Sequence, residues 1–288
     1  MTQIIESLKD WQLIRKKLSG NNSDVGFVPT MGNLHAGHAS LLQRSKHENS
    51  ITVLSIFVNP TQFAPHEDFE KYPRNIEHDS QLAHTAGTEI LFTPTVDEMY
   101  PVGYSTSIVV EGVSSVLEGK FRPTHYQGVT TVVGKLFSIV QPDKAYFGQK
   151  DAQQCAVIQK MVRDLNFNLA IVIVPTMRET DGLAMSSRNV YLNEQQRTDA
   201  TVLFQSLEKA KQLIDSGERN VQTIVAAMRA MIQKKTSAID YVEIVNAENL
   251  SSVDTLQSGT NVIVLLAVRF GTTRLIDNCI VTVKSRFT

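Results

Sequence analysis

The sequence predicts an α/β fold, with a Rossmann-like, doubly wound parallel sheet in the N-terminal domain and a smaller α+β domain after it. Short apolar strands alternate with helical segments through the first part of the chain, which is typical of a parallel sheet covered on both faces. In the last part, helices are followed by three consecutive strands, the order of an antiparallel sheet packed against helices. The segment 174–183 contains proline, threonine, aspartate and glycine, and we expect domains at 1–176 and 177–288.

The first domain is expected to begin its sheet at Val25–Val28, an apolar run that leads into a glycine-containing turn. Ile51–Val58 reads ITVLSIFV, which is nearly all apolar and rich in β-branched residues, as in a strand buried on both faces. Proline ends three later segments, at Pro94, Pro142 and Pro175. Further strands are expected at Glu89–Phe92, Ala145–Phe147 and Leu169–Val174, and helices at Gly37–Glu48, Glu77–Ala86, Gly128–Val140 and Asp151–Leu165, the last with Asp151 as N-cap.

The second domain carries clear helix boundaries. Asn193 and Gln196 have the spacing of a capping box, and Gly217 is expected to end the helix that they begin. The remaining elements are a helix over Val221–Lys234 and strands at Tyr241–Val245, Val262–Arg269 and Ile276–Val283. This order predicts a small domain with an antiparallel sheet.

The composition is that of an ordinary globular protein, and it excludes several classes of partner. The 288 residues are 42% hydrophobic and 20% charged, with a formal net charge of −1. No global positive field is available for nucleic acid or an anionic membrane, so a phosphate site must be local. The sequence contains no apolar run of about 18 residues, so we expect no membrane span. The polar N-terminus lacks the apolar core of a signal peptide. Cys155 and Cys279 stand far apart, so we expect free thiols in a reducing cytoplasm.

Two histidines mark the most informative segment. His35 and His38 lie three residues apart on the turn after Val25–Val28, where a helix is expected to begin at Gly37. Such a turn aims backbone N–H groups and the positive end of a helix at a ligand, usually a phosphate, and imidazoles can add hydrogen bonds or positive charge. The spacing G-x4-G-H lacks the lysine and hydroxyl of a P-loop. Zinc is the rival ligand, but no third metal-binding residue with suitable spacing is nearby, so no protein metal ligand is assigned.

Two other polar segments follow expected strands, whose carboxyl ends should meet at the ligand-binding edge of the sheet. In Asn59–Phe63 the Gln62 amide could bind a hydroxyl or carboxylate, although the segment by itself is more typical of an Asn-Pro turn. In Gly148–Asp151 the charge of Lys150 could meet a phosphate, and Gln154 lies one helical turn further on. A solvated lysine is the alternative.

Three more segments leave both a functional and a structural interpretation open. Met185–Asn189 has two hydroxyls and a guanidinium that could close over a triphosphate, or it could be a polar linker with an N-cap serine. Phe121–Gly128 could be a substrate-contacting loop or a structural turn. Glu77 and Asp79 lie in an expected helix, and we expect solvent to surround them.

Together these segments resemble the pantothenate synthetase (pantoate–β-alanine ligase) family, part of the nucleotidyltransferase superfamily with HIGH-type histidine signatures. The resemblance rests on the motifs PTMGNLHAGH, SIFVNPTQF, YPRN, GKFRPTHYQGV, KLFSIVQPDKAYFGQKDAQQ and RETDGLAMSSRN, in this order. It implies a two-step reaction. The carboxylate of (R)-pantoate attacks the α-phosphorus of Mg-ATP to give pantoyl adenylate and pyrophosphate, and the amine of β-alanine then displaces AMP to give pantothenate.

The resemblance also implies residue roles. The catalytic positions are His35, His38, Lys150 and Arg188, with His38 as proton donor. ATP contacts are implied for Met31, Gly32, His35, His38, Gly148, Gln149, Lys150, Asp151, Met177, Met185, Ser186, Ser187 and Arg188, and contacts with pantoate or β-alanine for Asn59, Gln62, Arg122 and Gln154. Mg²⁺ arrives with ATP. Domain 1–176 is expected to bind nucleotide and pantoate, and 177–288 to act as a lid, in a cytoplasmic homodimer without nucleic-acid or membrane partners.

Two rival functions share these residues. Another adenylyltransferase of the superfamily would join AMP to a phosphate-bearing acceptor, but the NPTQF and FRPTHYQG segments argue against it by family pattern. A catalytically silent nucleotide-binding protein would not need His35, His38, Lys150 and Arg188 together. The net charge of −1 argues against binding tRNA, as aminoacyl-tRNA synthetases of this superfamily do.

Overall fold

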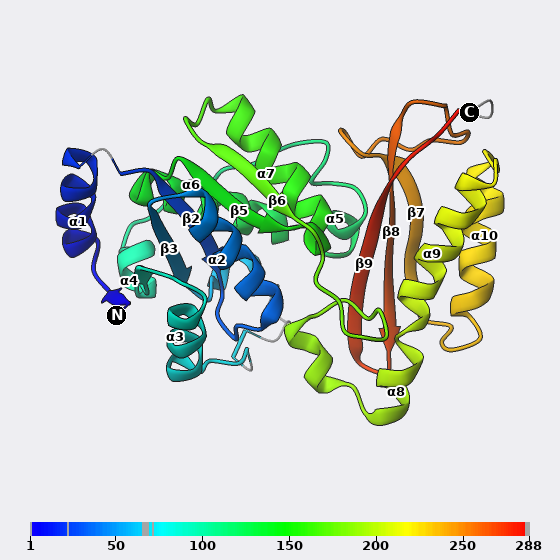
Figure 1. Cartoon of the computed structure of the whole chain (residues 1–288), viewed down its shortest axis with the longest axis horizontal. Coiled ribbons are helices and arrows are strands. Elements are labelled where there is room, and N and C mark those ends of the chain that lie inside the picture. Colours follow the sequence, from blue (N-terminus) through cyan, green and yellow to red (C-terminus); the bar gives the residue numbers. More distant parts are fainter. Residues whose placement is uncertain (1, 22, 65–68, 71, 286–288) are drawn as a thin grey trace. The chain divides into compact units, whose positions relative to one another are not determined.

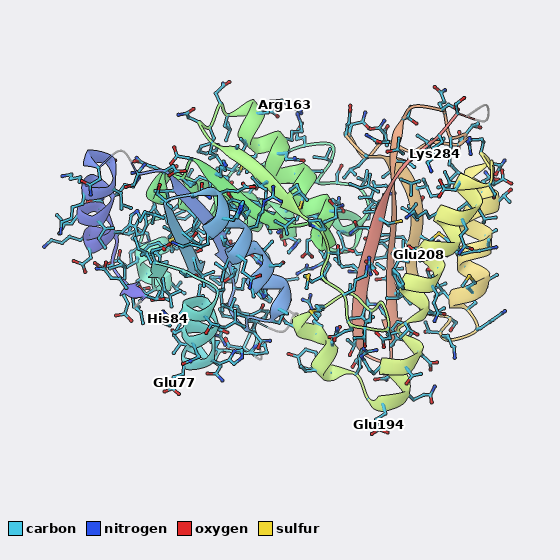
Figure 2. The ribbon with its side chains drawn as sticks, in the orientation of Figure 1. Glu77, His84, Arg163, Glu194, Glu208 and Lys284 are labelled. Carbon is cyan, nitrogen blue, oxygen red and sulfur yellow. The ribbon has the colours of Figure 1, made fainter. Side chains whose placement is uncertain are left out.

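The computed structural model describes residues 2–21, 23–64, 69–70 and 72–285. The chain forms two compact units (Figure 1), an N-terminal unit of Met1–Gln149 with Gln153–Pro175 and a C-terminal unit of Lys150–Ala152 with Thr176–Thr288. Figure 2 shows charged side chains of both signs at the surface, among them Glu77, Arg163, Glu194 and Lys284, in line with the net charge of −1. Within the described part of the chain, no helix has the length and apolar character needed to cross a bilayer.

The N-terminal unit is built on a parallel sheet with the strand order β1-β4-β3-β2-β5-β6. The apolar runs seen in the sequence form its buried centre, and Val25, Phe27 and Val28 of β2 are 0% exposed because helices cover both faces. The strands are β1 (Gln3–Ile5), β2 (Val25–Thr30), β3 (Ile51–Ile56), β4 (Ile90–Phe92), β5 (Lys144–Gly148) and β6 (Ala170–Val174).

Helices form a layer on each side of this sheet. On one side α2 (Ala36–Glu48) and α3 (Ile76–Thr85) share a core with β2, β3 and β4. On the other, α1 (Leu8–Gly20) packs against α6 (His125–Val140), where Trp11 Nε1 donates to Ile139 O over 2.7 Å, and α7 (Ala152–Asp164) lies beside α6. The short helical segments are η1 (Pro60–Gln62), α4 (Val96–Met99), α5 (Glu118–Phe121) and η2 (Gln149–Asp151).

The strand order reverses between β2 and β5. β3, β4 and β1 lie on one side of β2, whereas β5 and β6 lie on the other, and Phe27 of β2 pairs directly with Ala145 of β5. In open parallel sheets a ligand crevice lies beyond the carboxyl ends of the strands at such a switch point. The turn after β2 and the segment after β5 therefore both lie where this fold binds ligands.

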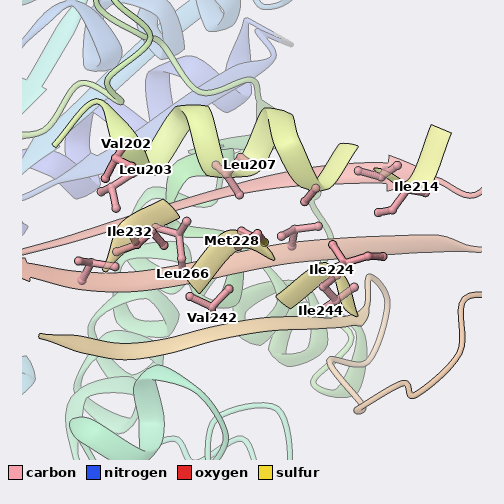
Figure 3. Packing of buried hydrophobic residues seen from close by; sticks show 14 of the residues in the cluster. Val202, Leu203, Leu207, Ile214, Ile224, Met228, Ile232, Val242, Ile244 and Leu266 are labelled. Carbon is pink, nitrogen blue, oxygen red and sulfur yellow. The ribbon is translucent and has the colours of Figure 1, made fainter. Parts of the chain in front are cut away.

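The C-terminal unit has an antiparallel sheet in the order β7-β8-β9, formed by β7 (Ile239–Asn246), β8 (Asn261–Phe270) and β9 (Thr273–Thr282). One face packs on α9 (Val202–Asp215) and α10 (Val221–Ile232), and Figure 3 shows Leu203, Leu207, Met228, Ile232 and Leu266 in the shared core. Before these come η3 (Ser187–Tyr191) and α8 (Glu194–Asp199).

The two fold classes are confirmed, and the element boundaries differ by a few residues. The expected capping box of Asn193 and Gln196 is present, but the helix that it begins ends at Asp199. Backbone bonds from Thr201 N to Thr198 O (3.3 Å) and from Leu203 N to Ala200 O (3.1 Å) tighten the chain there into a 3₁₀ turn before α9. Strand β1 and helix α1 were not anticipated, although Ser7 caps α1 and Leu8, Trp11 and Leu18 have helical spacing.

Candidate active site

A buried carboxylate holds the turn between β2 and α2. Asp79 of α3 is 1% exposed, and its two oxygens accept the backbone N–H groups of Asn33 (2.8 Å) and Leu34 (2.7 Å). Gly32 has a φ of +83°, and a Cβ there would lie 2.9 Å from Asp79 Oδ2, so both the backbone and the space require glycine. The expectation that solvent surrounds Asp79 is therefore wrong, whereas Glu77 is exposed as expected.

His35 and His38 cap the helix on which they lie. His35 is the N-cap of α2, and its Nδ1 accepts the Gly37 N–H over 3.1 Å. His38 Nδ1 accepts the His35 N–H over 3.2 Å, so the two side chains form a reciprocal capping box. The ring centroids are 4.2 Å apart. The helix consequently begins at Ala36, one residue before the expected start at Gly37.

These bonds determine which atoms can donate to a ligand. An Nδ1 that accepts a hydrogen bond carries no proton, so each neutral imidazole carries its proton on Nε2. The N–H groups of His38 and Ala39 already donate to His35 O, at 2.8 and 3.0 Å, and that of Gly37 donates to His35 Nδ1. These three N–H groups are bonded within the start of the helix, so the expected contact of first-turn N–H groups with a phosphate stays a prediction. The imidazole Nε2–H groups are therefore the side-chain atoms of this pair that can donate a hydrogen bond.

Asn59 ties η1 to the start of α6. It is 1% exposed, and its Nδ2 donates to Gln62 Oε1 and Gly128 O, both at 3.1 Å. Its Oδ1 accepts the Tyr100 hydroxyl over 2.8 Å and the Thr61 hydroxyl over 3.0 Å. A Cβ on Gly128 would lie 2.4 Å from Thr61 O, so glycine permits this close approach. The predicted contact of Asn59 with substrate stays a prediction, and these bonds favour a role in holding η1.

Gln62 brings three of the predicted residues together. Its Nε2 donates to Met31 Sδ over 2.9 Å, and its backbone oxygen accepts from Arg122 Nη2 over 3.4 Å and from His125 Nδ1 over 3.0 Å. A thioether is a weak acceptor, so the Gln62 amide can exchange Met31 for a stronger partner at little cost. The side chain of Gln62 is 8% exposed in this arrangement.

The segment after β5 carries two adjacent glutamines with different surroundings. The predicted Gln154 is half-buried on α7. Gln153, to which the sequence analysis assigned no role, is 3% exposed, and its Nε2 donates to the carbonyls of Val113 (2.8 Å) and Val116 (2.7 Å). Its Oε1 accepts the Glu118 N–H over 3.0 Å. Gln153 thus holds the chain that leads into α5.

Two predicted residues, Gly148 at the end of β5 and Gln149 at the start of η2, belong to the N-terminal unit, and the remaining ones belong to the C-terminal unit. The Lys150 side chain is 19% exposed with Nζ 3.6 Å from Asp151 Oδ1, and its carbonyl accepts Asn278 Nδ2 over 2.8 Å. Met177 and Met185 are joined by a 2.9 Å bond from Met185 N to Met177 O. The predicted Ser186, Ser187 and Arg188 follow, and Ser186 is the N-cap of η3, with its hydroxyl accepting the Arg188 N–H over 3.3 Å.

Tyr100 is a further residue whose place beside Asn59 could not be predicted from the sequence. Besides its bond to Asn59, its ring lies 5.0 Å from that of Tyr104, and Lys135 Nζ lies 4.5 Å from the Tyr104 ring centroid and 5.8 Å from that of Tyr100. Burial raises the pKa of Tyr100 and lowers the pKa of Lys135. The phenol therefore stays protonated and can donate to Asn59 throughout the physiological pH range.

The described residues do not fit a metal ion held mainly by the protein. Among them no group of three or more His, Cys, Asp or Glu side chains could coordinate an ion. Both oxygens of Asp79 are already bonded to backbone N–H groups. Mg²⁺ often binds chiefly through substrate phosphates, and its binding to this chain stays a prediction.

The sequence is similar to that of known ligases along almost its whole length. The family model for pantoate-beta-alanine ligase matches residues 3–280. The pantothenate synthetase of Acetivibrio thermocellus is 53% identical over 282 residues, which make up 98% of this chain and 100% of that protein.

Solved structures give the same likeness. The crystal structure of the pantothenate synthetase from Thermus thermophilus has a TM-score of 0.90 at 43% identity, and covers 99% of this chain and 100% of its own. That of a pantoate-beta-alanine ligase from Francisella tularensis, complexed with beta-gamma ATP and beta-alanine, has a TM-score of 0.79 at 32% identity, with 97% of each chain covered.

Proposed function

The chain belongs to the pantoate–β-alanine ligase family, and from this premise we propose that it joins (R)-pantoate to β-alanine with ATP, releasing AMP and pyrophosphate. The observation that carries the proposal is the His35–His38 capping box, which lies directly after β2 at the switch point of the sheet. The Francisella tularensis relative, complexed with ATP and β-alanine, supports the choice of substrates.

In the first step a carboxylate oxygen of pantoate bonds to the α-phosphorus, the bond from that phosphorus to the bridging oxygen breaks, and pyrophosphate leaves with the electron pair. Negative charge develops on the phosphate oxygens, so catalysis rests mainly on positioning and on fixed hydrogen-bond donors. We assign this stabilisation to the Nε2–H groups of His35 and His38 and to the cations of Lys150 and Arg188. The resemblance implies that His38 is the proton donor; because its Nδ1 accepts the His35 N–H, we propose that its Nε2–H donates a hydrogen bond to the phosphate oxygens and keeps its proton.

In the second step the amine of β-alanine attacks the acyl carbon, the bond from that carbon to the phosphate oxygen breaks, and AMP leaves as the amine loses a proton. We propose that Gln62 holds pantoate, because its amide has the weak acceptor Met31 Sδ as a replaceable partner. No enzyme nucleophile is required. Cys155 is buried, and burial raises the pKa of Cys279 to about 12, so neither thiol is suited to attack.

The other assignments follow from the family resemblance and are proposals. ATP contacts are proposed for Met31, Gly32, Gly148, Gln149, Asp151, Met177, Met185, Ser186 and Ser187, and substrate contacts for Asn59, Arg122 and Gln154. Mg²⁺ is proposed to enter as Mg-ATP. A homodimer, a cytoplasmic location, and the roles of 1–176 in nucleotide and pantoate binding and of 177–288 as a lid are proposed on the same basis.

AMP release from Mg-ATP, measured with pantoate and with or without β-alanine, tests this function. We expect turnover that requires both substrates and yields pantothenate with AMP. Pantoate-dependent exchange of labelled pyrophosphate into ATP, without β-alanine, would reveal the acyl adenylate. AMP production that is indifferent to pantoate would instead indicate a different adenylyl acceptor, and ATP binding without any turnover would indicate a silent nucleotide-binding protein.

A further inference from the structure

We propose that Asp277 and Asn278 of β9 are positioning residues that fix the two segments of the C-terminal unit to which ATP contacts are assigned. These segments are Lys150–Ala152 and the turn Met177–Met185. The inference rests on the proposed function, since it takes the ATP contacts of Lys150, Met177 and Met185 from there. The inference goes beyond the proposed function by naming residues that act through the ATP-contacting residues.

Asn278 fixes the backbone at Lys150. Asn278 is 3% exposed, and its Nδ2 donates to Lys150 O over 2.8 Å. The bond joins two residues that are 128 positions apart in the chain, so it anchors the lysine to the sheet of the C-terminal unit. A side chain that must present a charge to a phosphate needs a fixed Cα, because lysine has four flexible bonds beyond it.

Asp277 fixes the turn through Arg178. Its carboxylate accepts a two-pronged bond from Arg178, with Nη1 to Oδ2 at 2.6 Å and Nη2 to Oδ1 at 3.0 Å. The guanidinium also donates to Gly182 O over 3.0 Å and lies 4.8 Å from the centre of the Phe204 ring. Such a planar fork holds its partner in one orientation, which a single charge contact does not.

The turn that Arg178 anchors carries both methionines. Besides the bond between Met177 and Met185, Glu179 N donates to Leu183 O over 2.8 Å, and Arg178 and Ala184 form an antiparallel bridge. The turn therefore moves as one piece, and fixing Arg178 fixes Met177 and Met185 with it.

The alternation of side chains along β9 lets two adjacent residues contact two different segments of the chain. Successive side chains of β9 point to opposite faces of the sheet, so Asp277 and Asn278 reach different parts of the chain. Their partners on β8 are the apolar Leu266 and Leu265, and both polar side chains are almost fully buried. Replacing a buried ion pair with apolar residues is often neutral or stabilising, so fold stability alone does not account for the pair.

The test separates positioning from stability by measuring the dissociation constant for Mg-ATP, by calorimetry, beside the KM values for ATP and β-alanine. Asn278→Ala should weaken ATP binding about three- to tenfold, the effect of one lost hydrogen bond, and leave the KM for β-alanine unchanged. In a Lys150→Ala background the same change should have less than about a twofold further effect, because its action passes through Lys150. Asn261→Ala, at the other end of the same sheet, is the control and should leave ATP affinity unchanged.

The second arm replaces the ion pair with apolar residues of similar size. The double variant Arg178→Met with Asp277→Leu should keep or raise the melting temperature and still weaken ATP binding about tenfold. Unchanged ATP affinity in both folded variants would overturn the inference, as would equal effects of Asn278→Ala with and without Lys150. If the proposed function is wrong, the wild type will bind Mg-ATP without forming pantothenate. The ratio of the Mg-ATP dissociation constants of variant and wild type would still decide the inference in that case.

Discussion

Changing Asp79 to asparagine should lower activity strongly, although no substrate contact is assigned to Asp79 itself. The carboxylate accepts two backbone N–H groups, at Asn33 and Leu34, in the turn that ends at His35. Asparagine has one acceptor oxygen, and its NH2 group would face the other N–H. Hydrogen bonds to charged groups contribute about 1.5–3 kcal/mol each, so losing one and weakening the other should destabilise the turn by about 2–4 kcal/mol.

If that free energy is lost from the transition state, kcat/KM for pantoate-dependent AMP release should fall about 30- to 1,000-fold. Glu77→Gln is the matched control, because Glu77 starts the same helix but is exposed, and its rate should stay within about twofold of the wild type. Denaturant unfolding measures how much of the loss reaches the whole fold. A folded Asp79→Asn variant with a wild-type rate would show that the orientation of the histidine turn does not depend on this carboxylate.

Four further predictions each concern a single side chain. His38→Ala and Lys150→Ala should each reduce turnover by about two orders of magnitude or more, through loss of preorganised charge stabilisation, and near-wild-type rates in folded variants would remove them from the mechanism. Tyr100→Phe should raise the KM for pantoate by about three- to tenfold, because Asn59 Oδ1 loses its phenol donor and Asn59 in turn bonds to Gln62. An unchanged KM would show that Tyr100 does not help to position Gln62. Cys279, with a pKa raised by burial to about 12, should react with iodoacetamide at pH 8 about a thousandfold more slowly than a free thiol, since the thiolate becomes abundant only near the raised pKa. Rapid labelling of its peptide would contradict this.

The sheets and most helices could be predicted because their signal is local. The apolar run Ile51–Val58 and the capping box of Asn193 each lie within a few residues; the run formed strand β3 (Ile51–Ile56), and the capping box begins a helix at Glu194 as expected. The carboxyl-end segments could be located for the same reason, since each directly follows a strand. The split of the helix after Asp199 could not be predicted, because nothing in the apolar pattern of this segment distinguishes i→i+3 from i→i+4 hydrogen bonding.

The residues that hold the site in place were missed for a physical reason of a different kind. Asp79 reaches Leu34 across 45 residues, and Asn278 reaches Lys150 across 128, so no window of sequence contains both ends of either bond. An acid in an amphipathic helix and an asparagine in a strand look like surface residues until the fold buries them. Their burial is itself the diagnostic observation, because a polar side chain that leaves water without a partner costs about 1–3 kcal/mol.

The histidine pair shows how the same geometry limits what a motif can do. Two imidazoles beside a phosphate suggest positive charge, yet each Nδ1 here accepts a backbone N–H and must lack a proton. Protonating either ring would turn that acceptor into a donor and oppose the N–H that it caps. The cap of α2 therefore requires the neutral tautomer with its proton on Nε2. Under the proposed function, donation from this turn to a phosphate is accordingly dipolar, and we expect the net positive charge to come from Lys150 and Arg188.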